Sequence, residues 1–202
     1  MTSCECLRVR PSFKVYCILL TQVLFLIHAF FVMGCSALSK PIPASEALKN
    51  IRKVAVLPFN NISGQKEAGK IVANVFVTEI FKIGRFHVEE PGNVFQFMVQ
   101  ERISTIGEIE IERAKILGRR LGVDAVIVGT VDEFDDGKGG RYPTPVVSIT
   151  ARMIESGSGK LIWSAQNKKK GDDYIIILDF GEVRSVTTLA QKVVREMIET
   201  IR

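Results

Sequence analysis

Few residues after position 35 of this sequence could do chemistry. His87 is the only histidine there and no cysteine follows Cys35, so a histidine or thiolate metal site lacks ligands and a Ser/His/Asp relay has only one candidate base. Glu108, Glu110 and Glu112 come nearest to a set of paired acids, but a two-residue spacing on a helix points them in different directions. The sequence therefore predicts no catalytic, cofactor-binding or metal site, and we expect a protein that is not an enzyme.

Two short strings look like catalytic motifs but lack the partners those motifs need. Residues 157–160 (GSGK) resemble the end of a phosphate-binding loop, yet Ile154 stands where the first glycine is needed and Leu161 where a magnesium-binding hydroxyl belongs. Residues 179–181 (DFG) match a kinase metal motif, but no glycine-rich loop, strand lysine or catalytic-loop sequence accompanies them. We interpret the first string as a hairpin turn and the second as a chance match.

Cys35 is the one residue for which the sequence predicts a covalent modification. It follows a basic, polar start and an almost wholly apolar run over residues 15–33, which is long enough to cross a bilayer and has the pattern of a secretory signal. Residues 32–36 (VMGCS) resemble the lipobox of bacterial lipoproteins, whose cysteine thiol accepts diacylglycerol. We expect residues 1–34 to be a lipoprotein signal peptide, and Cys35 to carry diacylglycerol and an N-acyl chain. An uncleaved signal anchor, or a chance cysteine after an ordinary signal, is the alternative.

The lipid would hold the chain close to a membrane surface, because two or three acyl chains bind permanently where one binds only marginally. We assign residues 35–50 to a lipidated tether, since residues 36–45 contain two prolines and no periodic apolar pattern. In an extended, proline-rich form these residues reach only about 30 Å. Ser36 stands where an inner-membrane retention signal typically has Asp, which favours the periplasmic face of the outer membrane.

The part of the chain after the leader is long enough for one domain with its own core. The formal net charge of the whole chain is +5, of which the leader carries +2, leaving +3 for the rest, and no basic stripe with interleaved aromatic residues appears. We therefore expect no nucleic acid as a partner. Because no catalytic or cofactor site is predicted, we also expect no small-molecule substrate.

Residues 51–202 predict a single α/β domain, in which helices pack on a mixed, partly antiparallel sheet. Continuous apolar runs predict strands buried on both faces, alternating runs predict strands with two unlike faces, and apolar stripes of helical period predict helices that pack on the sheet. The predicted strands are residues 54–59, 84–88, 124–131, 146–154 and 160–166, and the predicted helices are residues 66–83, 94–103, 109–121 and a last one from Arg184. Turn-rich connections are predicted at 135–145 and 155–159.

Two apolar features do not fit the interior of this domain. The polar arc of the helix predicted at 66–83 contains a valine and a phenylalanine, which are either ordinary surface scatter or a contact with another subunit. An apolar tract between acidic residues, within 172–180, is by default a sheet strand, and otherwise an exposed loop that meets a neighbour or the bilayer. The candidate subunit or membrane contacts are Val77, Phe81, Tyr174, Ile175, Ile176 and Ile177.

The strand and turn motifs resemble those of the CsgG-like periplasmic lipoproteins. The resemblance rests on VAVLPFNN from Val54, GRFHVEE from Gly84, LGVDAVIVGTV from Leu121 and PVVSITARMIESGSGKLIWSA from Pro145. It covers residues 52–202, in a group that includes the curli secretion channel subunit, the PelC exopolysaccharide-export lipoprotein and the LpoB penicillin-binding-protein activator. It implies an outer-membrane-anchored domain of CsgG/LpoB-like fold without enzymatic activity, often assembled in rings.

Two departures from the family narrow this expectation. A membrane-spanning strand pair with its turn needs more than about 20 residues of alternating pattern, and the loops at 135–145 and 171–181 are shorter. A tether of about 30 Å is also too short to reach through the cell wall. We expect a non-catalytic lipoprotein that forms a homo-oligomer and works with other envelope proteins in secretion, exopolysaccharide export or envelope assembly. The alternative is a regulatory lipoprotein that activates a peptidoglycan synthase.

Overall fold

The computed structural model describes residues 48–102, 111–138, 144–177 and 180–201, together with Gln22 and Glu46. The chain divides between Pro41 and Ile42 into two compact units, and the fold described below is that of the second. The predicted signal peptide, apart from Gln22, and the predicted lipidation site Cys35 lie outside the described residues. Among the helices that are described, none has both the length and the apolar character needed to cross a bilayer.

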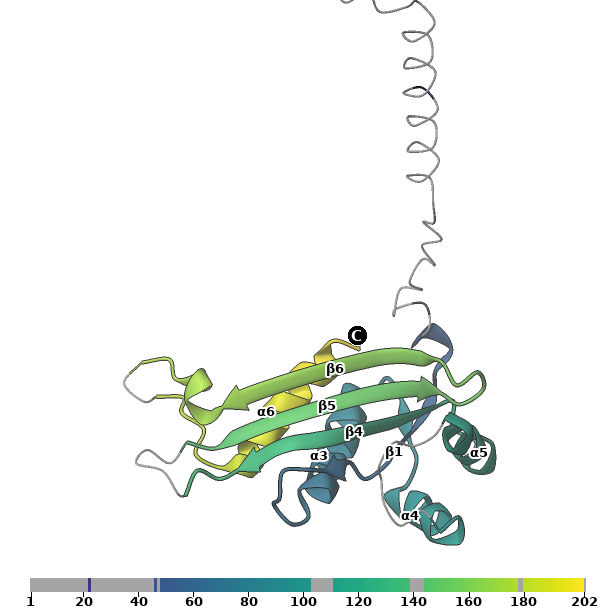
Figure 1. Ribbon diagram of the computed structural model, residues 1–202, viewed down its shortest axis with the longest axis horizontal. Helices are drawn as coiled ribbons and strands as arrows, with labels where there is room; N and C mark the ends of the chain where they lie inside the picture. Colours follow the sequence, from purple (N-terminus) through teal and green to yellow (C-terminus); the bar gives the residue numbers. More distant parts are fainter. Residues whose placement is uncertain are drawn as a thin grey trace, which may run out of the picture. The chain divides into compact units, whose positions relative to one another are not determined.

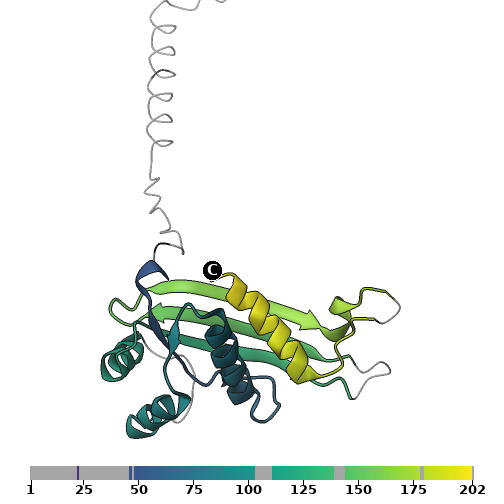
Figure 2. The same ribbon diagram turned by 180° about the vertical axis from the view of Figure 1, so that it is seen from behind.

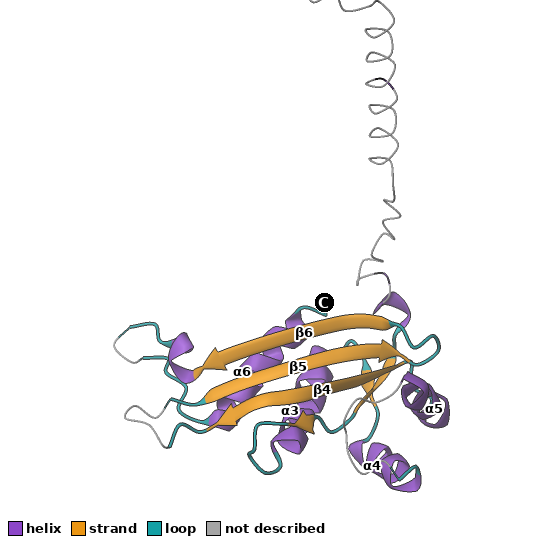
Figure 3. Cartoon of the chain, in the orientation of Figure 1, coloured by secondary structure: helices purple, strands orange, loops and turns teal. Residues whose placement is uncertain are grey.

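The domain is built on one mixed sheet of six strands, in the order β3-β1-β4-β5-β6 with β2 paired to the far half of β4 (Figures 1 and 3). β1 pairs in parallel with β3 and β4, whereas β4, β5 and β6 form an antiparallel meander. The strands are β1 (Lys53–Val56), β2 (Asn60–Asn61), β3 (His87–Val88), β4 (Ala125–Asp135), β5 (Val146–Glu155) and β6 (Leu161–Lys170). The prediction of a single α/β domain with a mixed, partly antiparallel sheet is confirmed.

Helices cover both faces of this sheet, but unequally. α3 and α6 lie side by side on one face (Figure 2) and bury the larger core, which includes Phe76, Ile127 and Met153. α4 and α5 close a smaller core that includes Leu57 and Val126, whose neighbours along the strands belong to the larger core. The helices are α3 (Ala68–Ile83), α4 (Pro91–Gln100), α5 (Ile111–Leu121) and α6 (Val186–Glu199), with short 3-10 turns η1 (Leu48–Asn50) and η2 (Gly171–Tyr174).

The observed boundaries of several elements differ from those that the apolar pattern predicts. Proline explains two of these differences and a β-bulge explains a third. β1 ends at Val56, two residues before Pro58, because proline has no N–H to donate to a ladder. α4 begins at Pro91, three residues before the predicted start, since proline suits the first turn of a helix. β4 runs to Asp135 rather than residue 131, with a bulge after Val131 that lets it keep pairing with β5.

The default prediction for residues 172–180, a sheet strand, is wrong. Of the described residues of this tract, 172–174 belong to η2, 175 and 176 lie in no helix or strand, and Ile177 and Phe180 form an isolated bridge. This is the exposed loop that was the alternative interpretation of the tract.

Candidate functional site

An open groove of about 770 Å³ lies between α3 and α4, beside the end of β1. Its floor includes Val56, Pro58 and Phe59, which follow one another as the chain leaves the sheet. Phe59 is buried and stacks on Phe76 of α3, with ring centroids 4.9 Å apart. The floor of the groove is therefore a fixed part of the larger core.

Close packing of α3 against the exit of β1 shapes one wall of this groove. The backbone N–H of Phe59 donates to the carbonyl of Gly69 at 3.2 Å. A β-carbon at Gly69 would lie 2.1 Å from the carbonyl oxygen of Phe59, so only glycine permits this approach. Ala73, Asn74 and Val77 continue the same wall along α3.

The opposite wall comes from α4, which has apolar residues on two sides. Val94, Phe97 and Met98 are buried in the smaller core, whereas Phe95 and Val99 are 64% and 60% exposed and line the groove. Two large apolar side chains, one turn apart, thus stand in solvent at the rim of an apolar depression.

The two candidates on α3 have different surroundings. Val77 is half-buried, packs against the larger core and lines the groove. Phe81, one turn later on the same helix, is 74% exposed and does not line the groove. Val77 lies within the polar arc of α3, but its side chain lines the groove, which explains why an apolar residue occurs at this position.

A second apolar surface lies at the opposite end of the β4–β6 meander, on the loop after η2 (Figure 1). We call Ile175, Ile176, Ile177 and Phe180 the apolar tip. Their side chains are 38%, 72%, 67% and 75% exposed. The tip is closed by its own backbone, because Ile176 N–H donates to the carbonyl of Phe180, and Phe180 N–H to that of Ile177, both at 2.8 Å.

The base of the apolar tip is tied to the sheet by backbone hydrogen bonds. Gly171 N–H donates to the carbonyl of Pro145 at 2.9 Å, and Val183 N–H to that of Gly171 at 3.0 Å. Asp173 accepts from the backbone N–H of Lys170 at 2.8 Å. The two ends of the loop are therefore held together at the end of β6, so that the tip protrudes from an ordered base.

Tyr174 belongs to this base rather than to the exposed tip. Its hydroxyl donates to the carboxylate of Glu196 on α6 at 2.7 Å, and Lys192 lies 4.4 Å from its ring centroid. Burial, together with the bond to the carboxylate, raises the pKa of Tyr174. Burial also acts to raise the pKa of Glu196, but hydrogen bonds from Tyr174 and Asn167 and the charge of Lys169 outweigh it and lower that pKa. At neutral pH the phenol of Tyr174 is therefore protonated and the carboxylate of Glu196 is ionised, so the hydrogen bond between them keeps its donor and its acceptor.

The residues that could have carried catalysis do not converge. His87 is exposed on β3, Glu112 is exposed in the first turn of α5, and residues 157–160 form the turn between β5 and β6. Glu108, Glu110 and Asp179 lie outside the described residues. In the described ranges, no three histidine, cysteine or acidic side chains are grouped as metal ligands would be.

Sequence reasoning missed Phe95 and Val99 as surface residues. The signal was present, since both belong to an apolar i, i+4 pair offset from Val94, Phe97 and Met98 on the same helix. Periodicity alone did not show which of the two apolar sides would be covered.

The comparisons with known proteins bear on the fold. No protein-family model and no curated protein matches the chain. Among solved structures, a point variant of the PelC dodecamer from Paraburkholderia phytofirmans has a TM-score of 0.55 at 20% identity, over 75% of this chain and 90% of that one. A second PelC dodecamer from that organism has a TM-score of 0.53 at 18% identity, over 73% and 86% of the two chains.

Lipoprotein GNA1162 from Neisseria meningitidis has a TM-score of 0.51 at 22% identity, over 74% of this chain and 97% of that one. The three matches cover 86–97% of the solved chains and 73–75% of this one, while the sequences share about one residue in five. The predicted resemblance is thus confirmed at the level of the fold: this chain has the α/β fold of PelC and of lipoprotein GNA1162.

Proposed function

We propose that this chain is a non-catalytic lipoprotein on the periplasmic face of the outer membrane, held there by diacylglycerol and an N-acyl chain on Cys35. It acts as a homo-oligomeric component of a secretion, exopolysaccharide-export or envelope-assembly system. The single observation that carries the proposal is the pairing of this fold with the apolar tip, four large side chains presented to solvent on an ordered base. Apolar side chains that are exposed to solvent do not stabilise a single domain, whereas burying them between copies would stabilise an assembly.

The similar structures support assembly rather than catalysis. PelC crystallised as a dodecamer, and GNA1162 is named a lipoprotein. Among the described residues that line the groove, the charged side chains are Glu67 and Lys70, which pair with each other at 3.7 Å. Glu79, Glu89 and Glu196, whose pKa values are lowered, each bond to a side chain of another element, and none of the three lines the groove. A cleft of this composition suits a protein contact better than bond cleavage.

Lipidation is tested by replacing Cys35 with Ala in the full chain and by following labelled palmitate and membrane fractionation. We expect loss of the label and failure of signal cleavage. Cys17→Ala is the matched control, since it removes another cysteine of the leader and should leave labelling intact. A Cys35→Ala chain that still incorporates palmitate would refute the proposed anchor.

Oligomeric state is tested by size-exclusion chromatography with light scattering on the purified, lipidated protein, corrected for bound detergent. We expect a species of several copies at micromolar concentration. A stable monomer would instead favour the regulatory lipoprotein that activates a peptidoglycan synthase, and would argue against an assembled component.

A further inference from the structure

We infer that the apolar tip of one copy seats in the α3–α4 groove of the next copy, so that identical chains join head to tail. This inference rests on the proposed homo-oligomer and names the two surfaces that build it. It concerns four tip residues, Ile175, Ile176, Ile177 and Phe180, and the groove rim formed by Phe95 and Val99.

The distribution of exposed apolar residues singles out these two surfaces. Nine large apolar side chains are exposed in the described part of the chain. Six of them lie in the apolar tip or on the groove rim, while Ile62, Phe81 and Leu161 belong to neither. The tip residues lie on an exposed loop, and the groove is a depression lined mainly by apolar residues, so an apolar loop is a suitable occupant for it.

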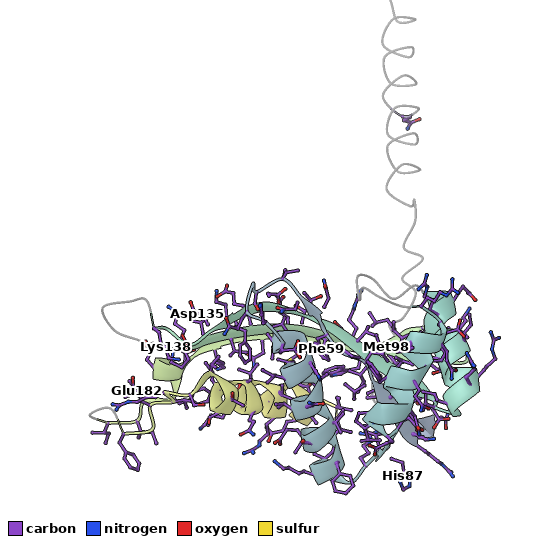
Figure 4. All side chains as sticks on the ribbon, turned by 90° about the horizontal axis from the view of Figure 1, so that it is seen from below. Phe59, His87, Met98, Asp135, Lys138 and Glu182 are labelled. Carbon is purple, nitrogen blue, oxygen red and sulfur yellow. The ribbon has the colours of Figure 1, made fainter. Side chains whose placement is uncertain are left out.

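The apolar tip and the groove of one copy lie too far apart to contact each other. Figure 1 places the loop after β6 at one end of the β4–β6 meander and α4 near the other end. Figure 4 shows the same separation, with Glu182 beside the tip at one end and Met98, which lines the groove, toward the other. Because β6 alone has ten residues, the meander is about 33 Å long. The tip therefore cannot reach the groove of its own chain, and a tip that seats in the groove must belong to another copy.

Two different patches on one chain make a heterologous contact, which repeats from copy to copy and closes into a ring when the rotation allows. A contact of like with like would need only one patch. The ordered base of the tip, pinned by Tyr174 and Asp173, reduces the entropy lost when the tip is buried. Since the contact is mainly apolar, added salt should not weaken it as it would weaken contacts between exposed charges.

The test uses the full lipidated chain in mild detergent, with an aspartate placed on each surface in turn. Phe95→Asp changes the groove and Ile176→Asp changes the tip. Both side chains are more than 60% exposed, so the substitutions should not disturb folding, which circular dichroism verifies. Leu161→Asp, at a residue that is 58% exposed and outside both surfaces, is the matched control. We expect each of the first two variants to associate about 30-fold more weakly or worse, as for an interface hot spot, and the control to keep the wild-type mass.

Mixing the two defective variants distinguishes a head-to-tail contact from all others. The tip of the Phe95→Asp chain and the groove of the Ile176→Asp chain are both intact, so one contact can form between them. We expect each variant alone to be monomeric and their equimolar mixture to give dimers and nothing larger. A like-with-like contact would leave one of the two variants associated by itself, which overturns the inference.

Three further outcomes also overturn it. If both variants keep the wild-type mass, the copies meet elsewhere, and the proposed oligomeric function survives without this contact. If the Ile176→Asp chain keeps its mass but binds lipid vesicles less well, the tip is a membrane contact. A monomeric wild type would remove the oligomeric proposal together with this inference.

Discussion

Tyr174, at the end of η2, donates a hydrogen bond of 2.7 Å to the carboxylate of Glu196 on α6. The bond joins the base of the apolar tip to the helix that covers the larger core. Asn167 of β6 donates to the same carboxylate at 3.0 Å, so one side chain links the strand before the tip, the tip and the last helix. The carboxylate of Glu196 therefore connects β6, the base of the tip and α6.

Replacing Tyr174 with Phe should loosen the tip without unfolding the domain. The change leaves the ring in place but removes one donor to a partly buried carboxylate, at a cost of about 1–2 kcal/mol. We expect faster cleavage after Phe180 in limited proteolysis with chymotrypsin, and a small loss of stability in urea. Glu196→Gln should act in the same direction, whereas Glu199→Gln, at an exposed position near the end of α6, serves as the control. Equal cleavage rates in wild type and Tyr174→Phe would contradict this role.

The burial and the hydrogen-bond partners of Glu79 allow a prediction of how the free energy of unfolding depends on pH. It is buried on α3 and accepts hydrogen bonds from Lys82 at 2.6 Å and from Arg195 of α6 at 3.3 Å. Burial alone would raise its pKa, but the bonds and charges of Lys82 and Arg195 outweigh burial, so the pKa lies below its usual 4.5.

A carboxylate with a lowered pKa in the folded state stabilises the fold above its unfolded pKa, and this contribution is lost as the pH falls through the folded value. Unfolding in urea between pH 7 and pH 3 should therefore show stability falling from about pH 4.5 downward. Glu79→Gln should lower stability at pH 7 by about 2 kcal/mol and flatten the fall at low pH. If wild type and variant lose the same stability between pH 5 and pH 3, Glu79 is not responsible.

Gly69 tests the close approach that shapes the groove. A β-carbon there would meet the backbone carbonyl oxygen of Phe59 at 2.1 Å, and neither backbone can move without shifting α3 or the exit of β1. Gly69→Ala should therefore destabilise the domain by about 2–3 kcal/mol, measured by urea or thermal unfolding. Gly157→Ala, where nothing lies within 4 Å and φ is not positive, should change stability little. A Gly69→Ala domain as stable as wild type would show that α3 does not pack this closely.

Glu67 offers a stabilising substitution. It precedes α3 with a φ of 63°, a left-handed conformation, and its side chain makes no cap hydrogen bond. Because the left-handed region costs a non-glycine residue about 1–2 kcal/mol, Glu67→Gly should raise stability by about 0.5–1 kcal/mol once the greater freedom of glycine in the unfolded chain is subtracted.

The matched control for Glu67 is Glu90, which holds the same position before α4 with a φ of −59°. Glu90→Gly gains nothing from relief of strain and should be neutral or slightly destabilising in the same thermal unfolding assay. Stabilisation by both substitutions, or by neither, would argue against the strain at Glu67.

Much of the fold followed from local patterns. Val54 and Ala125 open continuous apolar runs, and both are fully buried at the centre of the sheet. The apolar stripe of the last helix is buried along its whole length, and Ser185 caps its start by accepting from Thr188 N–H. Periodicity succeeds for such elements because burial of one face, or of both, is decided within the element itself.

The two exposed apolar surfaces could not be predicted from local patterns in the same way. Residues 175–177 have the composition of a strand, but they join no strand of the sheet, and Ile177 forms only an isolated bridge with Phe180. Phe95 and Phe97 are alike in sequence, yet one is 64% exposed and the other 3%. Nothing within α4 distinguishes them; only the position of β4 and α5 does.

The sequence by itself determined a lipobox-like cysteine as a prediction, a single α/β domain, and the order of its strands and helices, because each depends on composition or on spacing along the chain. Only the tertiary structure decided that Ile176, Ile177 and Phe180 protrude, and that Val77 faces a groove beside an exposed Phe95. The physical reason is that a side chain is covered or left exposed by elements distant in sequence, and periodicity records the preference of each residue for burial but not which neighbour provides it.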